Sequence, residues 1–293
     1  MRPYNNNEPT MTDIICIGHI TKDCIITPDQ TAYLPGGTAW YVGCGLAALN
    51  KEKKVSFKLL TAMAEADREP VEQLRQMGIE VECLPSPETL YFENRYGADF
   101  NNRQQRVLAQ AAPFTTKQLK NCDGRFILLG SLLAHDFPLE AFPMLHDKGC
   151  LVVDVQGYLR EVRGEQVHAI DWKDKLEALK YVDILKVNEY EMEVLTGQTD
   201  PRKAALQLAE WGVREVLLTF GSYGSLIYDA EKKEFHDIPA IRPSKLVDAT
   251  GCGDTYVLGY IFKRAQGASI PEAGLFAAQV SAKKLEASGP LKG

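Results

Sequence analysis

The stretch DATGCGDTYVLG, residues 248–259, places two glycines around a cysteine and follows them with an aspartate and an apolar segment. The apolar positions from Val257 onward recur with the spacing of one face of an α-helix. We therefore predict that Gly251–Gly253 is a loop that opens a helix and that Asp254 lies in its first turn. Because the first amides of a helix lack internal partners and lie at the positive end of the helix dipole, this loop is a candidate anion site.

Asp254 is the unexpected residue of this stretch, because a carboxylate and a bound anion repel each other. One explanation is chemical: the aspartate is a base that takes a proton from a hydroxyl while the anion is the group being transferred. The alternative is a simple helix start, in which the negative side chain complements the dipole.

Short apolar runs alternate with helical patterns along most of the chain. Strands are predicted at 14–20, 57–63, 125–133, 150–157, 182–188 and 214–221, followed by a hairpin. Helices are predicted at 38–50, 67–77, 189–196, 201–212 and twice after residue 250, the last from the capping box Ser269–Glu272. This alternation predicts an α/β fold with a mostly parallel sheet and helices on both faces.

Two segments, at about 23–36 and 89–111, break this rhythm with short strand patterns and no helical period. We interpret them as strands of a small sheet inserted into the α/β body. Residues 1–12 are polar and are predicted to form a disordered extension, so that 13–293 form a single domain.

Composition excludes several classes of protein. The 293 residues are 45% hydrophobic and 25% charged, with a net charge of −6, which argues against a general nucleic-acid binder. No apolar run approaches the roughly 18 residues that span a membrane. The seven cysteines are odd in number and form no C-x-x-C pair, which indicates reduced thiols in a cytoplasmic protein.

The motifs together resemble the ribokinase-like carbohydrate kinases, also called the PfkB family, over nearly the whole chain. The family signature, approximately D-T-x-G-A-G-D, is matched by residues 248–254. The resemblance implies a central, mostly parallel sheet flanked by helices, with a small β-sheet lid. It also implies that the amides of Gly251, Cys252 and Gly253 form an anion hole for the γ-phosphate and that Asp254 is the catalytic base.

Two further motifs resemble the nucleotide end of the family's site. Asn188-x-x-Glu191 resembles the N-x-x-E element near magnesium and the phosphates, and residues 219–224 resemble the T-x-G-x-x-G segment that meets the nucleotide. Each also has a local explanation, as a helix cap and as a β-turn. The resemblance implies ATP and Mg²⁺, with Glu191 reaching the metal through water, and a monovalent cation such as K⁺. The candidate nucleotide-binding residues are Lys186, Asn188, Thr219, Gly221, Gly224 and Thr250.

The substrate end of the site is expected near the lid. The resemblance implies that Asp23 holds hydroxyl groups and that Gly36-Gly37 is the hinge of the lid. Tyr41 stands where ribokinase-type members usually have asparagine, so the substrate need not be ribose. The candidate substrate-binding residues are Asp23, Gly36, Gly37, Tyr41, Asn94 and Arg160, although Asp23 and Arg160 also fit an ordinary solvated surface.

These observations predict ATP-dependent phosphorylation of a hydroxyl, expected to be primary, on a small sugar or polyol. Two alternatives stay open: a nucleoside kinase of the same fold, and a catalytically silent member that binds sugar or nucleotide. The expected partners are the small-molecule acceptor and ATP, with no nucleic acid and no membrane. The open strand edges of the lid also predict a homodimer.

Overall fold

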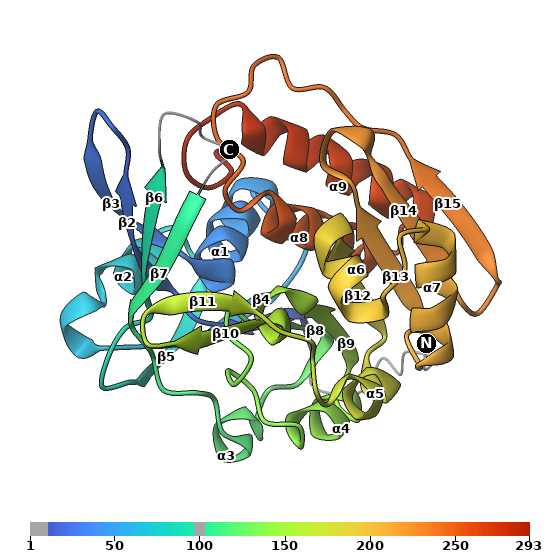
Figure 1. The fold of residues 1–293 in the computed structure, drawn as a ribbon, viewed down its shortest axis with the longest axis horizontal. Coiled ribbons are helices and arrows are strands. Elements are labelled where there is room, and N and C mark those ends of the chain that lie inside the picture. The colour runs from blue at the N-terminus through green and yellow to red at the C-terminus, as the bar shows by residue number, and fades with distance from the viewer. Residues whose placement is uncertain (1–10, 97–102) are drawn as a thin grey trace.

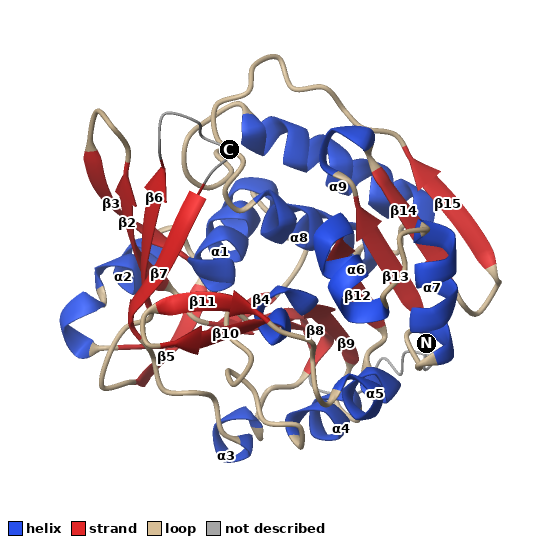
Figure 2. Cartoon of the chain, viewed as in Figure 1, coloured by secondary structure: helices blue, strands red, loops and turns tan. Residues whose placement is uncertain are grey.

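The computed structural model describes residues 11–96 and 103–293, and these form an α/β body with a small second sheet beside it (Figures 1 and 2). Within these ranges the large sheet has nine strands. In spatial order they are β15 (Glu234–Ile238), β14 (Ser225–Asp229), β13 (Glu215–Thr219), β12 (Ile184–Asn188), β9 (Cys150–Asp154), β8 (Gly124–Gly130), β1 (Thr12–Gly18), β4 (Phe57–Met63) and β5 (Glu80–Pro85).

All strands of the large sheet from β13 to β5 are parallel, and the predicted hairpin β14–β15 is antiparallel at one edge. The predicted α/β architecture with a mostly parallel sheet is therefore confirmed. Residues 1–10 of the predicted disordered extension lie outside the described residues, and Thr12 already belongs to β1.

Helices cover both faces of the large sheet, because parallel strands are apolar on both sides. One face packs against α1 (Gly37–Leu49), α2 (Glu69–Gln76), α8 (Cys252–Ala265) and α9 (Ile270–Leu285). The other face packs against α3 (Thr116–Leu119), α4 (Ala141–His146), α5 (Lys175–Ala178), α6 (Glu189–Thr196) and α7 (Pro201–Glu210). Four short 3₁₀ turns complete the described helices: η1 (Glu65–Asp67), η2 (Val155–Leu159), η3 (Leu179–Tyr181) and η4 (Gly221–Tyr223). None of the helices in the described ranges is long and apolar enough to cross a membrane.

The helix starts that sequence capping signals predicted are present. Asn188 and Glu191 form a complete capping box at the start of α6, and Ser269 with Glu272 forms another at α9. Asp200 caps α7 by accepting from the amides of Arg202 and Lys203. These contacts are local, which explains why a single sequence could locate them.

The small sheet contains the predicted lid strands β2 (Thr21–Ile26), β3 (Thr31–Gly36), β6 (Tyr91–Tyr96) and β7 (Arg103–Ala109). Part of the segment predicted at 89–111, residues 97–102, lies outside the described residues. The sheet is larger than expected, because the hairpin β10 (Arg160–Arg163) and β11 (Gln166–Ala169) extends it beyond β7. Figure 1 shows β10 and β11 side by side next to β7. The strand predicted at 150–157 therefore ends at Asp154 and is followed by a 3₁₀ turn and a hairpin.

Candidate active site

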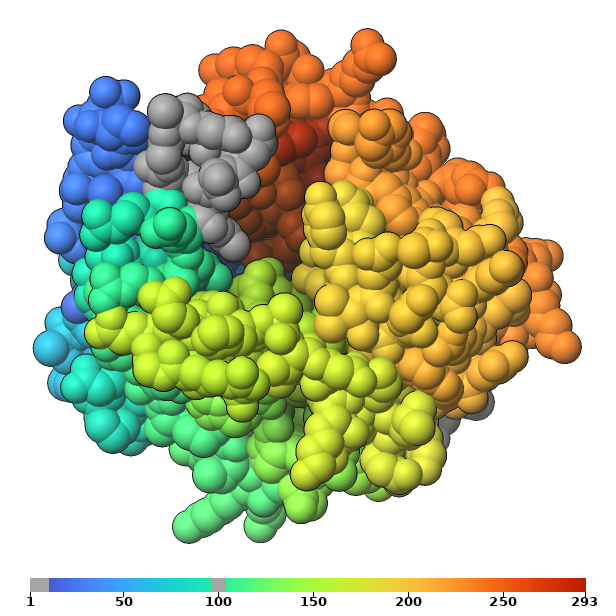
Figure 3. All heavy atoms as spheres, viewed as in Figure 1, coloured from blue at the N-terminus to red at the C-terminus, as the bar shows by residue number. Residues whose placement is uncertain are grey.

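Several parallel strands end at one edge of the large sheet, which is where open α/β sheets bind ligands. β9 ends at Asp154, β12 ends at Asn188 and β13 ends at Thr219. The α8 helix starts beside them with the 248–254 motif. Figure 3 shows a depression on this face, bordered by the β10–β11 hairpin and by α6, with the colours of the C-terminal helices at its floor.

Gly251 is the N-cap of α8 and adopts the left-handed region, with φ of 75°. A Cβ at this position would come within 2.2 Å of the Tyr41 ring. Backbone conformation and close approach thus both require glycine here. Tyr41, which was predicted to bind substrate, lies on α1 and is buried. Its ring packs against Gly251 in the predicted anion loop.

The amides at the start of α8 are only partly available for an anion. The Cys252 amide donates to the Ala249 carbonyl at 3.2 Å, and the Thr255 amide donates to the Gly251 carbonyl at 2.9 Å. Within the described chain no backbone acceptor pairs with the amides of Gly251, Gly253 or Asp254. In this conformation the predicted anion hole therefore consists of those three amides, and the Cys252 amide is engaged in a turn.

The Asp254 carboxylate is the least satisfied group of the site. Its Oδ1 atom is closed off from solvent and has no hydrogen-bond partner of ordinary geometry in the described chain. Burial, and next the nearby Asp154 charge, raise its pKa from 3.8 to about 6, against the lowering influence of Thr38 and Lys186. Leaving such a group unpaired destabilises a fold, so an oxygen of this kind points to a role with a ligand.

An ion pair lies directly beside Asp254. Lys186 Nζ is 3.1 Å from Asp154 Oδ2 and 3.8 Å from Glu191 Oε2, and all three residues are buried. The two strands place Lys186 opposite Asp154 in register. A Cβ on Gly253 would come within 2.9 Å of Lys186 Nζ, so the ammonium lies against the anion loop. This cation is therefore placed to attract phosphate oxygens bound at the loop.

Glu191 and Asn188 have the local role that the sequence allowed. Glu191 Oε2 accepts from the Asn188 amide at 2.8 Å, and Asn188 Oδ1 accepts from the amides of Tyr190 and Glu191. Burial raises the pKa of Glu191, and the nearby Lys186 charge and the Asn188 amide offset this effect only in part. The capping role is therefore present, and the same arrangement leaves Glu191 beside Lys186.

The described residues contain no cluster of three His, Cys, Asp or Glu side chains that could hold a metal ion alone. Mg²⁺ does not need one, because it commonly uses one or two carboxylates, several waters and substrate phosphates. Asp154 and Glu191 are the two buried carboxylates beside Lys186, so this donor set fits a magnesium ion that arrives with phosphates.

The substrate end lies where the small sheet meets α1. Asp23, on β2, accepts a hydrogen bond from Thr21 Oγ1 at 2.7 Å. A Cβ on Gly36 would come within 2.3 Å of Asp23 Oδ2, and Gly37 has φ of 82°. The double glycine thus lets the turn from β3 into α1 pass close to the Asp23 carboxylate.

Two other predicted substrate residues occupy different settings. Asn94, on β6, is buried and accepts from Gln105 Nε2 at 2.9 Å, within the small sheet. Arg160 starts β10 and donates to Gln156 Oε1 at 3.0 Å. Its charge lowers the pKa of both Asp254 and Glu191, so it acts on the same site. Arg160 also belongs to the small sheet through β10, which the sequence did not reveal.

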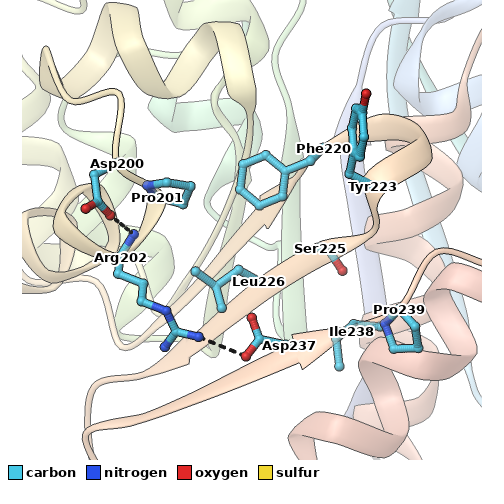
Figure 4. A pocket seen from close by; sticks show the side chains of 10 residues that line it. All are labelled: Asp200, Pro201, Arg202, Phe220, Tyr223, Ser225, Leu226, Asp237, Ile238 and Pro239. Atoms are coloured by element: carbon cyan, nitrogen blue, oxygen red, sulfur yellow. Dashed lines mark hydrogen bonds and ion pairs between the residues drawn. The ribbon is translucent and has the colours of Figure 1, made fainter.

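The 219–224 turn is followed by a separate hollow. A cavity of about 610 Å³ lies between the start of α7, this turn and β15, and it contains none of the residues around Asp254. Figure 4 shows Phe220 and Tyr223 at one end of the hollow, the Arg202–Asp237 ion pair at the other, and Leu226 between them. Thr219, at the end of β13, donates its hydroxyl to the Val187 carbonyl at 3.5 Å, and Gly221 and Gly224 belong to the turn that follows.

Asp154 and Thr38 are the residues beside Asp254 that the sequence did not single out. Lys186 was among the candidate nucleotide-binding residues, whereas its partner Asp154 and the neighbouring Thr38 were not among the candidates. The available signal was the end of a buried apolar strand in a carboxylate, which is where a parallel sheet presents functional groups.

Comparison with known proteins agrees with this architecture. A family model described as pfkB family carbohydrate kinase matches residues 154–292. A solved structure described as a pyrophosphate-dependent kinase in the ribokinase family is 30% identical, with a TM-score of 0.84, and covers 95% of this chain and 97% of that one. The cytidine kinase of Thermococcus kodakarensis is 28% identical over 269 residues, or 89% of this chain and 92% of its own length. The Arabidopsis thaliana ribokinase, solved with ribose and ATP, has a TM-score of 0.76 at 18% identity and so shares the fold.

An α/β body with a small second sheet and a phosphate-type loop at the strand ends defines a ribokinase-like kinase. This chain belongs to the PfkB family of carbohydrate kinases. It is accordingly a kinase.

Proposed function

We propose that this kinase transfers a phosphoryl group from ATP to a hydroxyl, expected to be primary, of a small sugar or polyol. The observation that carries the proposal is the closed-off, unpaired Oδ1 of Asp254 beside the open amides of Gly251 and Gly253. A base and an anion site in contact are what transfer to a hydroxyl requires.

In this proposal Asp254 takes the hydroxyl proton as the acceptor oxygen bonds to phosphorus and the bond to the leaving phosphate breaks. The amides at the start of α8 and the Lys186 ammonium hold the developing negative charge. Glu191 and Asp154 would hold Mg²⁺ through water together with the donor phosphates, and the ion would supply further charge neutralisation. Positioning and electrostatics then do most of the catalysis, as phosphoryl transfer generally requires.

Asp23 binds acceptor hydroxyls, because a carboxylate accepts from two neighbouring hydroxyls at once. Gly36 and Gly37 leave room for the acceptor between the lid and α1. Asn94, Tyr41 and Arg160 remain proposed contacts that shape this end of the site.

Leu246 and Val247 support ATP as the donor. They lie just before the anion loop and are 74% and 49% exposed. Exposed apolar side chains beside an anion site suit a phosphate donor that carries a flat, partly apolar base. Thr219, Gly221, Gly224 and Thr250 are proposed to meet the same nucleotide, with Asn188 at its phosphate end.

Pyrophosphate is the second candidate donor, because solved structures about 30% identical to this chain are described as pyrophosphate-dependent, one of them complexed with a pyrophosphate analogue and myo-inositol. A nucleoside is the second candidate acceptor, since the cytidine kinase relative matches along nearly its full length.

One experiment separates these candidates. Purified protein with Mg²⁺ is given either ATP or pyrophosphate, together with a panel of pentoses, hexoses, inositols and nucleosides, and phosphorylated products are identified by mass spectrometry. Sugar or polyol phosphate formed from ATP supports the proposal. Turnover restricted to nucleosides or to pyrophosphate selects the corresponding second candidate, and no turnover with any pair selects a binding protein without catalysis.

We also propose that two copies associate through the small sheet. β3 lies at its edge and carries Tyr33 and Leu34, which are 70% and 43% exposed. An open strand edge with exposed apolar side chains favours pairing with another strand. Sedimentation equilibrium should give a dimer for the wild type and a shift toward monomer for Leu34→Lys; a wild-type monomer at 50-fold excess over the assay concentration would contradict the proposal.

A further inference from the structure

Lys284 is a buried cation that no motif explains. It lies in the last turn of α9, and its side chain is 0% exposed. Its Nζ donates to the Asp248 carbonyl at 2.7 Å and lies 3.2 Å from the Asp248 carboxylate Oδ2. Lysine is almost never fully buried unless it is paired, so the pair with Asp248 needs a reason.

Asp248 is the first residue of the 248–254 motif and is a junction of hydrogen bonds. Its carboxylate accepts from the amides of Thr250 and Gly289, at 2.9 and 3.1 Å. The preceding residue, Val247, donates its amide to the Leu285 carbonyl at the end of α9. The loop that leads to the anion hole is thereby attached to the C-terminal end of α9.

This junction concentrates negative charge. It combines the Asp248 carboxylate, the Asp248 carbonyl and the negative end of the α9 dipole, a few residues before the amides that receive the anion. Without compensation these groups would oppose phosphate binding at the loop. Lys284 supplies the compensating positive charge, and that charge is also felt at Cys252, whose pKa it lowers against the larger effect of burial.

We propose that Lys284 is a positioning residue for phosphoryl transfer, a covalently attached cation that holds the anion loop in shape and balances its charge. The inference rests on the proposed kinase chemistry for its catalytic consequence, but its structural consequence can be measured without turnover. Carbonyl and carboxylate oxygens are also the ligands that K⁺ accepts. Because the Lys284 ammonium already pairs with these oxygens, the loop needs no dissociable monovalent cation.

The test compares Lys284→Met and Lys284→Ala with wild type and with Lys283→Met. Lys283 is the exposed neighbour on the same helix, so its substitution removes the same charge from solvent. Each protein is studied in KCl, in NH₄Cl and in tetramethylammonium chloride at equal ionic strength. Tetramethylammonium is too large to enter a site vacated by an ammonium group.

The first readout is hydrogen exchange of the amides in residues 247–253. Wild type and Lys283→Met should show the same protection in all three salts. Lys284→Ala should lose protection in tetramethylammonium and recover it in K⁺ or NH₄⁺, which a merely structural lysine would not predict. This measurement needs no substrate, so it decides the proposal even if the kinase assay fails.

The second readout is turnover with the acceptor that the substrate panel identifies. Lys284→Met should lower kcat by about 10²-fold, the usual effect of misplacing reacting groups by about 1 Å, with a much smaller change in the acceptor KM. Lys284→Ala should regain at least tenfold of its lost kcat in K⁺ or NH₄⁺, while wild-type kcat stays within about twofold across the salts.

Three results would overturn the proposal. The first is a wild-type protein whose hydrogen-exchange protection in 247–253, or whose kcat, requires K⁺. This result would show that a dissociable cation, and not Lys284, balances the charge of the loop. The second is wild-type loop protection in folded Lys284→Met. The third is a loss in both variants that no small cation restores, which would reduce Lys284 to a support of the fold. If neither variant folds, the hydrogen exchange of residues 247–253 in the wild-type protein, compared across the three salts, still tests whether the loop needs a dissociable cation.

Discussion

Replacing Asp254 by asparagine keeps the shape of the side chain and removes its ability to accept a proton. If Asp254 is the general base, kcat should fall by about 10²–10⁴-fold, the usual contribution of a positioned base. ATP affinity should change little, because the anion loop and Lys186 are untouched. A matched control is Asp237→Asn, an exposed carboxylate paired with Arg202 outside the Asp254 cluster.

The same substitution has a calculable effect on stability. Raising the pKa of Asp254 from 3.8 to about 6 corresponds to about 3 kcal/mol of unfavourable free energy for the charged form in the folded chain. Above pH 6 the carboxylate is charged in both the folded and the unfolded chain, and this full cost is present. As the pH falls through 6 toward 3.8, the folded chain takes up the proton first and the cost disappears.

Asp254→Asn should therefore be more stable than wild type at pH 8, by up to about 3 kcal/mol or about 6 °C in Tm for a chain of this size. The difference should shrink by roughly half at pH 5. Wild-type kcat/KM should fall as the pH drops through about 6, close to tenfold per pH unit below it.

The assays are steady-state kinetics and thermal denaturation monitored by circular dichroism between pH 4.5 and 8.5. Turnover of Asp254→Asn within a few-fold of wild type would refute the role of Asp254 as base. A variant that is slow but no more stable than wild type at pH 8 would refute the burial argument, while leaving the catalytic role intact.

Three further outcomes are expected. Asp23→Ala should weaken acceptor binding at least tenfold and leave ATP binding unchanged in calorimetry; the reverse pattern would mean that Asp23 is misassigned. Cys252→Ala should keep kcat within about threefold, which is under roughly 0.7 kcal/mol of activation free energy, because burial raises the pKa of this thiol to about 11 and keeps it neutral. Cys252→Leu should lower kcat more, because the larger side chain crowds the phosphate. A tenfold loss of kcat in a folded Cys252→Ala protein would show that the thiol itself takes part. Gly251→Ala should lower kcat by about 10²-fold, because a Cβ at this position meets the Tyr41 ring. The control is Gly267→Ala, which also has a positive φ but has no atom within 4 Å of its Cβ, so it reports backbone strain alone. Equal kcat in the two variants would show that the contact with Tyr41 does not matter.

Most of the candidate site could be predicted from the sequence because its signals are local. The 248–254 motif predicted both the loop and the helix α8 that follows it, and the Asn188–Glu191 capping box predicted the start of α6. Apolar strand runs separated by capped helices predicted a parallel sheet, and with it the edge at which strand ends carry polar groups. Each signal lies within a few residues, where spacing and backbone chemistry limit the possible conformations.

The details of the site depend on contacts between residues far apart in the chain. Lys186 meets Asp154 because their strands are neighbours in register, and Tyr41 reaches Gly251 because α1 packs beside α8. The β10–β11 hairpin joins the small sheet through a single register pair with β7, for which its sequence carries no distinct pattern.

The sequence by itself therefore indicated the family, most of the order of strands and helices, and the candidate residues of the anion loop. Only the tertiary structure decided that the Cys252 amide is engaged, that Asp254 Oδ1 is closed off without a partner, and that Lys284 pairs with Asp248. The physical reason is that burial and pairing are properties of the packed chain. A carboxylate or an ammonium acquires its energy from the charges and solvent around it, and packing brings these from segments that local sequence does not connect.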